Sequence, residues 1–182
     1  MSFSSDLVFD GNKNAPYHET DQVNPLNVYG ASKADGEKRI CTSDPSALII
    51  RTSAFFGPWD KYNFVYSVLS SLERNESLTV PSDVMVSPTY VPDLANTALD
   101  LFIDEEEGIW HITNDGMLTW ADFGQAVAER GGFEKKMLLT KPLIEMDWKA
   151  KRPLFSVLRS EKGIKLPALD NALVRYFEQR DV

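Results

Sequence analysis

Tyr29 and Lys33 are the two residues of this sequence whose types and spacing first indicate chemistry. They stand four residues apart, so on a helix both side chains leave the same face and reach a common ligand. A phenol normally titrates near pH 10, and a neighbouring ammonium group favours the phenolate form. Such a pair is suited to giving a proton to a carbonyl oxygen while hydride adds to the carbon. With six tyrosines and eleven lysines in the chain, this spacing arises by chance in roughly one case in three, so the neighbouring residues must decide.

The composition is that of a globular domain without nucleic-acid or membrane partners. The chain has 182 residues, 43% of them hydrophobic, and a net charge of −8. This acidic balance disfavours a surface for nucleic acid or anionic membranes. We find no apolar run of membrane-spanning length and no signal peptide, and the single cysteine, Cys41, excludes an internal disulfide. We therefore expect a cytoplasmic protein.

Strands and helices alternate along the chain, which favours an α/β fold with parallel strands. The run at residues 47–50 is apolar without alternation, as in a strand that is buried on both faces. Thr119 is placed to cap the helix that follows it. We expect strands at residues 3–9, 47–50, 78–80, 109–113 and 137–140, and helices at residues 28–41, 62–74, 92–102, 119–130, 160–164 and 169–179.

Outside the Tyr-Lys pair, the reactive side chains favour structural interpretations. His18 lies in a polar loop, where we expect it to be solvated, and His111 lies in an apolar strand, where a hydrogen-bonded core histidine is the better interpretation. Cys41 is expected to be a small buried residue. Two separated histidines without a carboxylate cluster do not make a metal site, so we expect none. Trp59 and Trp148 remain open: they could line a sugar pocket, since aromatic faces suit sugar rings, or be surface or packing residues.

Several motifs occur in an order that is far more specific than the Tyr-Lys pair alone. They are Ser4-Ser5-Asp6-Leu7-Val8-Phe9-Asp10-Gly11, Pro16-Tyr17-His18-Glu19, Tyr29-Gly30-Ala31-Ser32-Lys33, Arg51-Thr52-Ser53, Asn63-Phe64, Ser87-Pro88-Thr89-Tyr90-Val91-Pro92-Asp93, Gly108-Ile109-Trp110-His111 and Arg152-Pro153. With them the whole chain resembles the extended short-chain dehydrogenases/reductases, and most closely the dTDP-4-dehydrorhamnose reductase branch with its RmlD-like substrate-binding part.

The resemblance implies NAD(P)H-dependent reduction of a nucleotide-linked 4-keto-6-deoxy sugar. It implies three catalytic residues: Tyr29 as general acid, Lys33 as the residue that holds the nicotinamide ribose beside it, and Ser5 as the residue that orients the keto oxygen. Tyr29 and Lys33 would also be the contacts to the cofactor, NADPH or NADH. The implied substrate-binding residues are Ser5, Asp6, Ser53, Asn63 and Arg152, of which Arg152 suits a diphosphate through its planar fork.

The nucleotide-binding half of that family has no counterpart in this sequence. The Gly-x-x-Gly-x-x-Gly turn, which places a pyrophosphate at a helix N-terminus, is absent from the 182 residues. We therefore expect the C-terminal part of a reductase, with an incomplete Rossmann-like parallel sheet and a small α/β substrate-binding subdomain. Residues 1–60 would form the catalytic segment, and residues 61–182 a sugar-nucleotide-binding region interleaved with the core.

Taken alone, this part is expected to be inactive and to bind the dinucleotide only weakly, because most of the contacts to it would be missing. Its free sheet edge should pair with something. We expect self-association, a rearranged N-terminal segment, or an upstream nucleotide-binding domain as the partner of that edge.

Two alternatives remain open on the same scaffold. One is a non-catalytic sugar-nucleotide-binding or regulatory module, similar to the regulatory subunit of methionine adenosyltransferase. The missing nucleotide-binding half favours this module, whereas Ser5, Tyr29 and Lys33 favour the enzyme. The other alternative is a sugar-nucleotide epimerase or dehydratase. Ala54 stands where the resembling reductases carry tryptophan, which leaves the exact sugar open.

Overall fold

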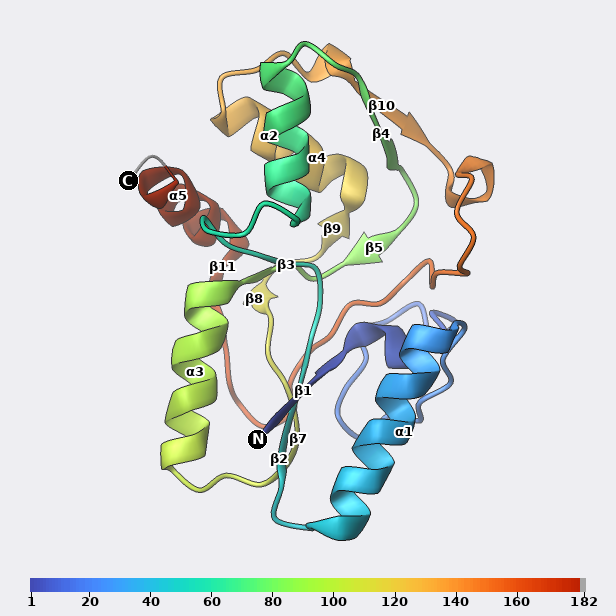
Figure 1. The fold of residues 1–182 in the computed structure, drawn as a ribbon, viewed down its shortest axis with the longest axis vertical. Coiled ribbons are helices and arrows are strands. Elements are labelled where there is room, and N and C mark those ends of the chain that lie inside the picture. The colour runs from blue at the N-terminus through green and yellow to red at the C-terminus, as the bar shows by residue number, and fades with distance from the viewer. Residues whose placement is uncertain (181–182) are drawn as a thin grey trace.

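The structure is a computed structural model that describes residues 1–180, and its centre is a parallel sheet with the strand order β1-β2-β7 (Figure 1). β1 spans Ser2–Ser5, β2 spans Leu48–Thr52 and β7 spans Gly108–His111. All of β2 is buried, because it lies between two neighbouring strands and has a helix on each face. Its unbroken apolar run predicted this position.

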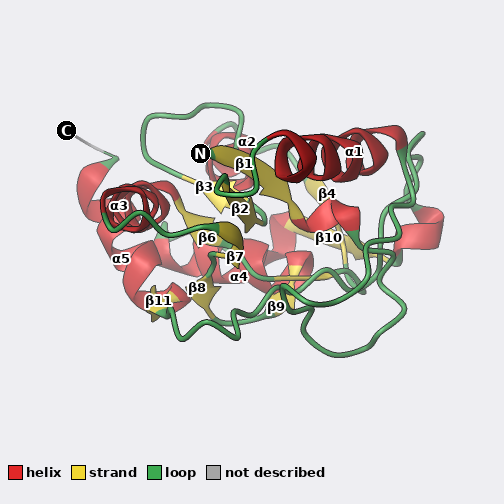
Figure 2. Cartoon of the chain, turned by 90° about the horizontal axis from the view of Figure 1, so that it is seen from below, coloured by secondary structure: helices red, strands yellow, loops and turns green. Residues whose placement is uncertain are grey.

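Helices α1 and α3 cover opposite faces of this sheet, as Figures 1 and 2 show. α1 spans Val28–Ser43 and α3 spans Val91–Ile103. Successive residues of a strand point to opposite faces, so Ile50 packs in a cluster with apolar side chains of α3, whereas Arg51 points to α1 and pairs with Glu37. We call β1, β2, β7, α1 and α3 the sheet region.

The second part of the molecule, which we call the helical region, packs α2 and α4 against a parallel strand pair at the top of Figure 1, and α5 joins their core. Its elements are α2 (Phe64–Glu73), α4 (Trp120–Arg130), α5 (Leu169–Gln179), β4 (Leu78–Pro81) and β10 (Leu138–Lys141). Their apolar faces share one core that includes Phe56, Val65, Leu69, Phe123 and Leu173. Val65 and Leu69 are four residues apart and lie on the buried face of α2, as the spacing of an amphipathic helix requires.

Short strand pairs and 3-10 turns complete the fold. The strand pairs are β3 (Phe55–Phe56) with β6 (Thr89–Tyr90), β5 (Met85–Val86) with β9 (Leu118–Thr119), and β8 (Asn114–Asp115) with β11 (Leu166–Ala168). The 3-10 turns are Asp6–Val8, Lys135–Met137 and Leu143–Glu145. Among residues 1–180, no helix is both long enough and apolar enough to span a bilayer.

Side-chain caps begin the helices α1, α2 and α4. Asn27 accepts a hydrogen bond from the backbone N–H of Gly30 at the start of α1, and Asn63 caps α2 in the same way. Thr119 accepts from the backbone N–H of Asp122 and begins α4, as predicted. Each cap satisfies a backbone donor that the first turn of a helix leaves free.

Two predicted elements are wrong in extent or in kind. The strand expected at residues 3–9 ends at Ser5, because the Ser5 side chain caps a 3-10 turn by accepting from the backbone N–H of Leu7. The helix expected at 160–164 does not form. There the backbone N–H of Glu161 donates to Glu19, and Gly163 has a φ of +85°, which no α-helix accommodates.

Two expectations for single residues also need correction. Cys41 is only half-buried on α1 rather than enclosed in a core. His18 is not simply solvated, because its Nδ1 lies 2.6 Å from a carboxylate oxygen of Glu161 and ties the polar loop to the C-terminal segment.

Candidate functional site

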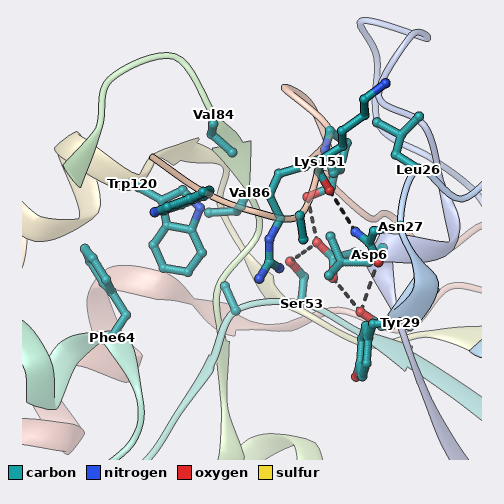
Figure 3. Close-up of a pocket in the computed structure, with 18 of the residues that line it drawn as sticks. Asp6, Leu26, Asn27, Tyr29, Ser53, Phe64, Val84, Val86, Trp120 and Lys151 are labelled. Carbon is teal, nitrogen blue, oxygen red and sulfur yellow. Dashed lines mark hydrogen bonds between the residues drawn. The ribbon is translucent and has the colours of Figure 1, made fainter. Parts of the chain in front are cut away.

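A large cavity, drawn in Figure 3, lies where the sheet region meets the helical region, at the carboxyl end of β1. It has a volume of about 1070 Å³. Figure 3 shows two unlike walls: Asp6, Ser53 and Tyr29 lie on one side, and Phe64 and Trp120 on the other. Pockets for small molecules combine an apolar surface with a few placed polar groups in this manner.

Gly30 allows Tyr29 to reach this cavity. A Cβ atom on Gly30 would overlap the carbonyl oxygen of Leu7, in the turn directly after β1. Without that atom, the first turn of α1 packs closely against the end of β1. The glycine of the motif therefore brings Tyr29 and Ser5 to the same cavity, and both side chains line it.

Lys33 lies beside Tyr29, as the helical spacing predicted, but it does not line the cavity. Its Nζ is 5.8 Å from the centroid of the Tyr29 ring. The same atom donates a hydrogen bond of 3.2 Å to the backbone carbonyl of Phe3 in β1. Since an ammonium group has three donors, two remain for a ligand at the outer side of Tyr29, whose side chain is 52% exposed.

Asp6 is the most enclosed charged group of the site, with 7% of its surface exposed. Three serine hydroxyls donate to its carboxylate: Ser5 at 2.9 Å, Ser53 at 2.8 Å and Ser156 at 2.6 Å. Burial raises the pKa of Asp6 above its ordinary value, while the three hydroxyls and the charge of Arg152 act in the opposite direction.

The Ser5 hydroxyl is not available as a donor to a ligand in this structure. Its hydroxyl proton goes to Asp6, and its oxygen accepts from the backbone N–H of Leu7 at 3.2 Å. A hydroxyl has one proton to give. For Ser5 to orient a keto oxygen, that proton must turn from the Asp6 carboxylate to the ligand.

Asn63 and Arg152 are the other two predicted substrate residues, and they differ in whether their polar atoms are available to a ligand. The Asn63 amide is buried and fully engaged, because it donates to the carbonyls of Gly57 and Asp60 and accepts from the N–H of Tyr66. Arg152 is exposed on the rim. Asn63 therefore serves as part of the cavity wall, whereas Arg152 offers a cation to a ligand.

The structure distinguishes the two tryptophans that the sequence left open. Trp148 lines the cavity, and the Arg152 guanidinium carbon lies 5.8 Å from the centroid of its ring. Trp59 does not line the cavity and is 74% exposed.

Sequence reasoning missed Ser156 and the apolar wall. That wall consists of Phe64, Trp120, Val84 and Val86. The rings of Phe64 and Trp120 pack edge to face, with centroids 4.6 Å apart. Phe64 and Trp120 are apolar residues at the start of α2 and α4, and nothing local in the sequence separates a cavity wall from a core.

His111 is a satisfied core histidine, as predicted. It is 2% exposed, its Nδ1 donates to the carbonyl of Tyr17 at 3.0 Å, and its Nε2 lies 3.3 Å from Nη1 of Arg51, which donates to it. Burial, with Arg51 acting in the same direction, lowers its pKa to about 4. Within residues 1–180, no group of three or more histidine, cysteine or carboxylate side chains is arranged to hold a metal ion.

The sequence matches the family described as RmlD substrate binding domain over residues 1–180. It is 37% identical over 184 residues to the spore coat polysaccharide biosynthesis protein SpsK of Bacillus subtilis, a match that covers 99% of this chain and 64% of that protein. It is 36% identical over 170 residues to a dTDP-4-dehydrorhamnose reductase of Aggregatibacter actinomycetemcomitans, which covers 87% of this chain and 57% of that protein.

Solved structures agree with this match. The dTDP-4-dehydrorhamnose reductase of Bacillus anthracis, in complex with NADP, superposes with a TM-score of 0.92 at 28% identity, over 98% of this chain and 64% of that one. The corresponding protein of Clostridium acetobutylicum gives 0.92 at 30% identity, over 100% of this chain and 65% of that one. The chain thus spans less than two thirds of each of these four relatives. These likenesses confirm the predicted α/β, Rossmann-like class, and because the match extends over residues 1–180, the chain belongs to the RmlD substrate binding domain family.

Proposed function

We propose that this chain is the catalytic and substrate-binding part of a reductase that acts on a nucleotide-linked 4-keto-6-deoxy sugar. The observation that carries the proposal is the meeting of Ser5, Asp6 and Tyr29 in one cavity, with Lys33 beside Tyr29. The named dTDP-4-dehydrorhamnose reductases among the relatives support the same substrate class. In this proposal residues 1–60 supply the reacting groups, and residues 61–182 supply most of the sugar-nucleotide pocket.

Tyr29 is the proton donor in this proposal. Its phenol stands at the cavity and is partly exposed, so its Oη gives a proton to the keto oxygen of the sugar. Ser5 turns its hydroxyl from Asp6 to the same oxygen and fixes the orientation of the carbonyl. General acid assistance of this kind is worth about 10²–10⁴ in rate.

The residues around Tyr29 fit the nicotinamide end of a dinucleotide. Two donors of the Lys33 ammonium remain after its bond to Phe3, and they suit ribose hydroxyls at the outer side of Tyr29. NADPH or NADH supplies the hydride when it is bound. One relative of solved structure is a complex with NADP, which favours this class of cofactor.

The wall of the cavity also suits a nucleotide sugar. Trp148 and the apolar wall offer faces for sugar and base rings, and Arg152 offers a planar cation for a diphosphate. Ser53 reaches the cavity from the end of β2, although its hydroxyl proton is committed to Asp6. We keep Asp6, Ser53 and Arg152 as proposed substrate contacts, and Asn63 as a wall residue of the same pocket.

The test compares the 182-residue chain with a protein in which it is joined to the part of the Aggregatibacter reductase outside the match. We expect turnover of a dTDP-4-keto-6-deoxy sugar with NADPH or NADH only in the joined protein. The chain alone should bind either dinucleotide with a dissociation constant of about 1 mM or weaker. Tyr29→Phe in the joined protein should lower kcat by roughly 10²–10⁴ while the sugar nucleotide still binds.

Tyr62→Phe is the matched control, because Tyr62 also borders the cavity but is 96% exposed. Its loss should leave kcat within about twofold. Near-normal turnover of the Tyr29→Phe protein would remove Tyr29 from the mechanism. Micromolar binding of NADPH by the chain alone would show that the cofactor contacts lie within these residues.

A further inference from the structure

Three serine hydroxyls converge on one buried carboxylate from three distant parts of the chain. Ser5 ends β1, Ser53 follows β2, and Ser156 belongs to the C-terminal segment, 150 residues after Asp6. All three serines are at least nine-tenths buried, and Ser156 is 2% exposed. Buried polar groups need hydrogen-bond partners, and here the fold brings these partners together from distant segments.

The division of these bonds between the two carboxylate oxygens is unequal. Oδ2 of Asp6 accepts from both Ser53 and Ser156, whereas Oδ1 accepts from Ser5 alone. The charged group that acts on Asp6 is Arg152, from the rim of the cavity. Asp6 therefore stays compensated at Oδ2 if the Ser5 hydroxyl turns away from Oδ1.

The backbone around Ser156 holds its hydroxyl in place. The N–H of Ser156 donates to the carbonyl of Met85 at 3.0 Å, and the N–H of Met85 donates to the carbonyl of Leu154 at 2.8 Å. Two residues further on, the N–H of Leu158 donates to the Ser87 hydroxyl at 3.0 Å. Ser156 is thus fixed on both sides, and its hydroxyl is aimed at Asp6.

We propose that Ser156 is a positioning residue for the reaction and acts on Ser5 through Asp6. Together with Ser53 it keeps the Asp6 charge hydrogen-bonded at the moment when Ser5 leaves Oδ1 to meet the keto oxygen. The inference rests on the proposed function, because it assigns Ser5 the same encounter with the carbonyl. Without the Ser156 hydroxyl, Asp6 retains a single donor at that moment, so it holds the Ser5 proton more strongly.

The experiment uses Ser156→Ala, with Ser87→Ala as the matched control. Ser87 is also a buried serine, 1% exposed, and it binds the same C-terminal segment without contacting Asp6. In the 182-residue chain, a carbon-13 NMR titration follows the Asp6 carboxyl group. Ser156→Ala should raise the pKa of Asp6, because a donor to its carboxylate is removed, and Ser87→Ala should leave it unchanged.

In the joined protein, Ser156→Ala should lower kcat by roughly 10- to 100-fold with little change in sugar-nucleotide affinity. Ser87→Ala should alter thermal stability more than kcat. An unchanged Asp6 titration in Ser156→Ala, or equal kcat losses in both variants, would overturn the proposal. If the unmodified joined protein shows no turnover, the proposed function itself fails, and the carboxyl titration alone then decides whether Ser156 sets the state of Asp6.

Discussion

The interface between α1 and the central sheet buries an ion pair, whereas the core of the helical region is apolar, although both regions border one cavity. In the sheet region, Glu37 of α1 and Arg51 of β2 are each less than a tenth exposed, as is Asp6 in the turn after β1. The helical region encloses aromatic and aliphatic side chains, with Phe123 in ring contact with three others. Directed bonds between polar partners thus hold α1 to the sheet, whereas close packing holds the helical region together.

This difference predicts how each region responds to substitution. A buried hydrogen-bonded or charged group that loses its partner costs the full desolvation of that group. An apolar core, by contrast, tolerates a change of shape if the volume is kept. An isosteric exchange should therefore be costly in the sheet region and mild in the helical region.

The largest expected effect is on the buried pair of Glu37 and Arg51. Glu37 accepts two bonds from the guanidinium, at 2.9 and 2.7 Å, and joins α1 to β2. Glu37→Gln keeps the shape but leaves the Arg51 charge buried without its counter-charge. We expect the free energy of unfolding in urea to fall by about 3–5 kcal/mol.

Asp35→Asn on the same helix is the control, because the Asp35–Arg39 pair is exposed. Its loss should cost only about 0.3–0.5 kcal/mol. Equal effects of the two substitutions would mean that the buried pair contributes no more than a surface pair.

The next effect is a pH dependence that belongs to the sheet region. Burial lowers the pKa of His111 to about 4, below its ordinary value of 6.5. The unfolded chain therefore takes up this proton first, and stability falls as the pH drops from 6.5 toward 4. Over that window the loss should reach about 3 kcal/mol in urea unfolding.

His111→Gln should remove most of this slope, and the slope above pH 6.5 should be unaffected. An NMR titration of the imidazole provides a direct check. A midpoint near the ordinary value for His111 would contradict the burial argument.

A third prediction concerns two glycines on one helix. Gly30→Ala places a Cβ atom against the Leu7 carbonyl, so α1 must move from the end of β1. We expect a loss of roughly 2–3 kcal/mol in thermal or urea unfolding, with displaced amide resonances at Ser5 and Tyr29.

Gly36 lies on the same helix with no atom near its Cβ position. Gly36→Ala should stabilise the protein by about 0.5–1 kcal/mol, because glycine is the poorer helix former. Opposite signs for the two substitutions would confirm that close approach, rather than helix propensity, selects Gly30.

The smallest effect is expected in the helical region. Leu69 is 2% exposed in its apolar core, and Leu69→Met keeps the volume without removing a bonded partner. We expect the free energy of unfolding to change by less than about 1.5 kcal/mol. A loss as large as that of Glu37→Gln would break the comparison between the two regions.

Much of the fold was predictable because its signals are local. The sequence located α1, α2, α3, α4 and α5 within a few residues, and the Thr119 cap is where the sequence placed it. The strand expected at residues 3–9 fails through a local cap, but the helix expected at 160–164 fails because of a partner far along the chain. Residues 160–164 do not form a helix, because the Glu19 carboxylate accepts hydrogen bonds from the backbone N–H of Glu161 and the hydroxyl of Ser160.

The sequence by itself determined the α/β class, because strands and helices alternate along the chain. It also determined the Tyr29–Lys33 pair on one helix and the motif that carries Ser5 and Asp6, because each of these lies within one short stretch. Only the tertiary structure decided that Ser156 donates to Asp6 and that Phe64 lies across the cavity from Asp6. It also decided that Asn63 is occupied by its own backbone neighbours. The sequence around a serine or an aromatic residue does not show which distant group its side chain will contact. Its partner depends on chain packing over as many as 150 residues, which no short window of sequence contains.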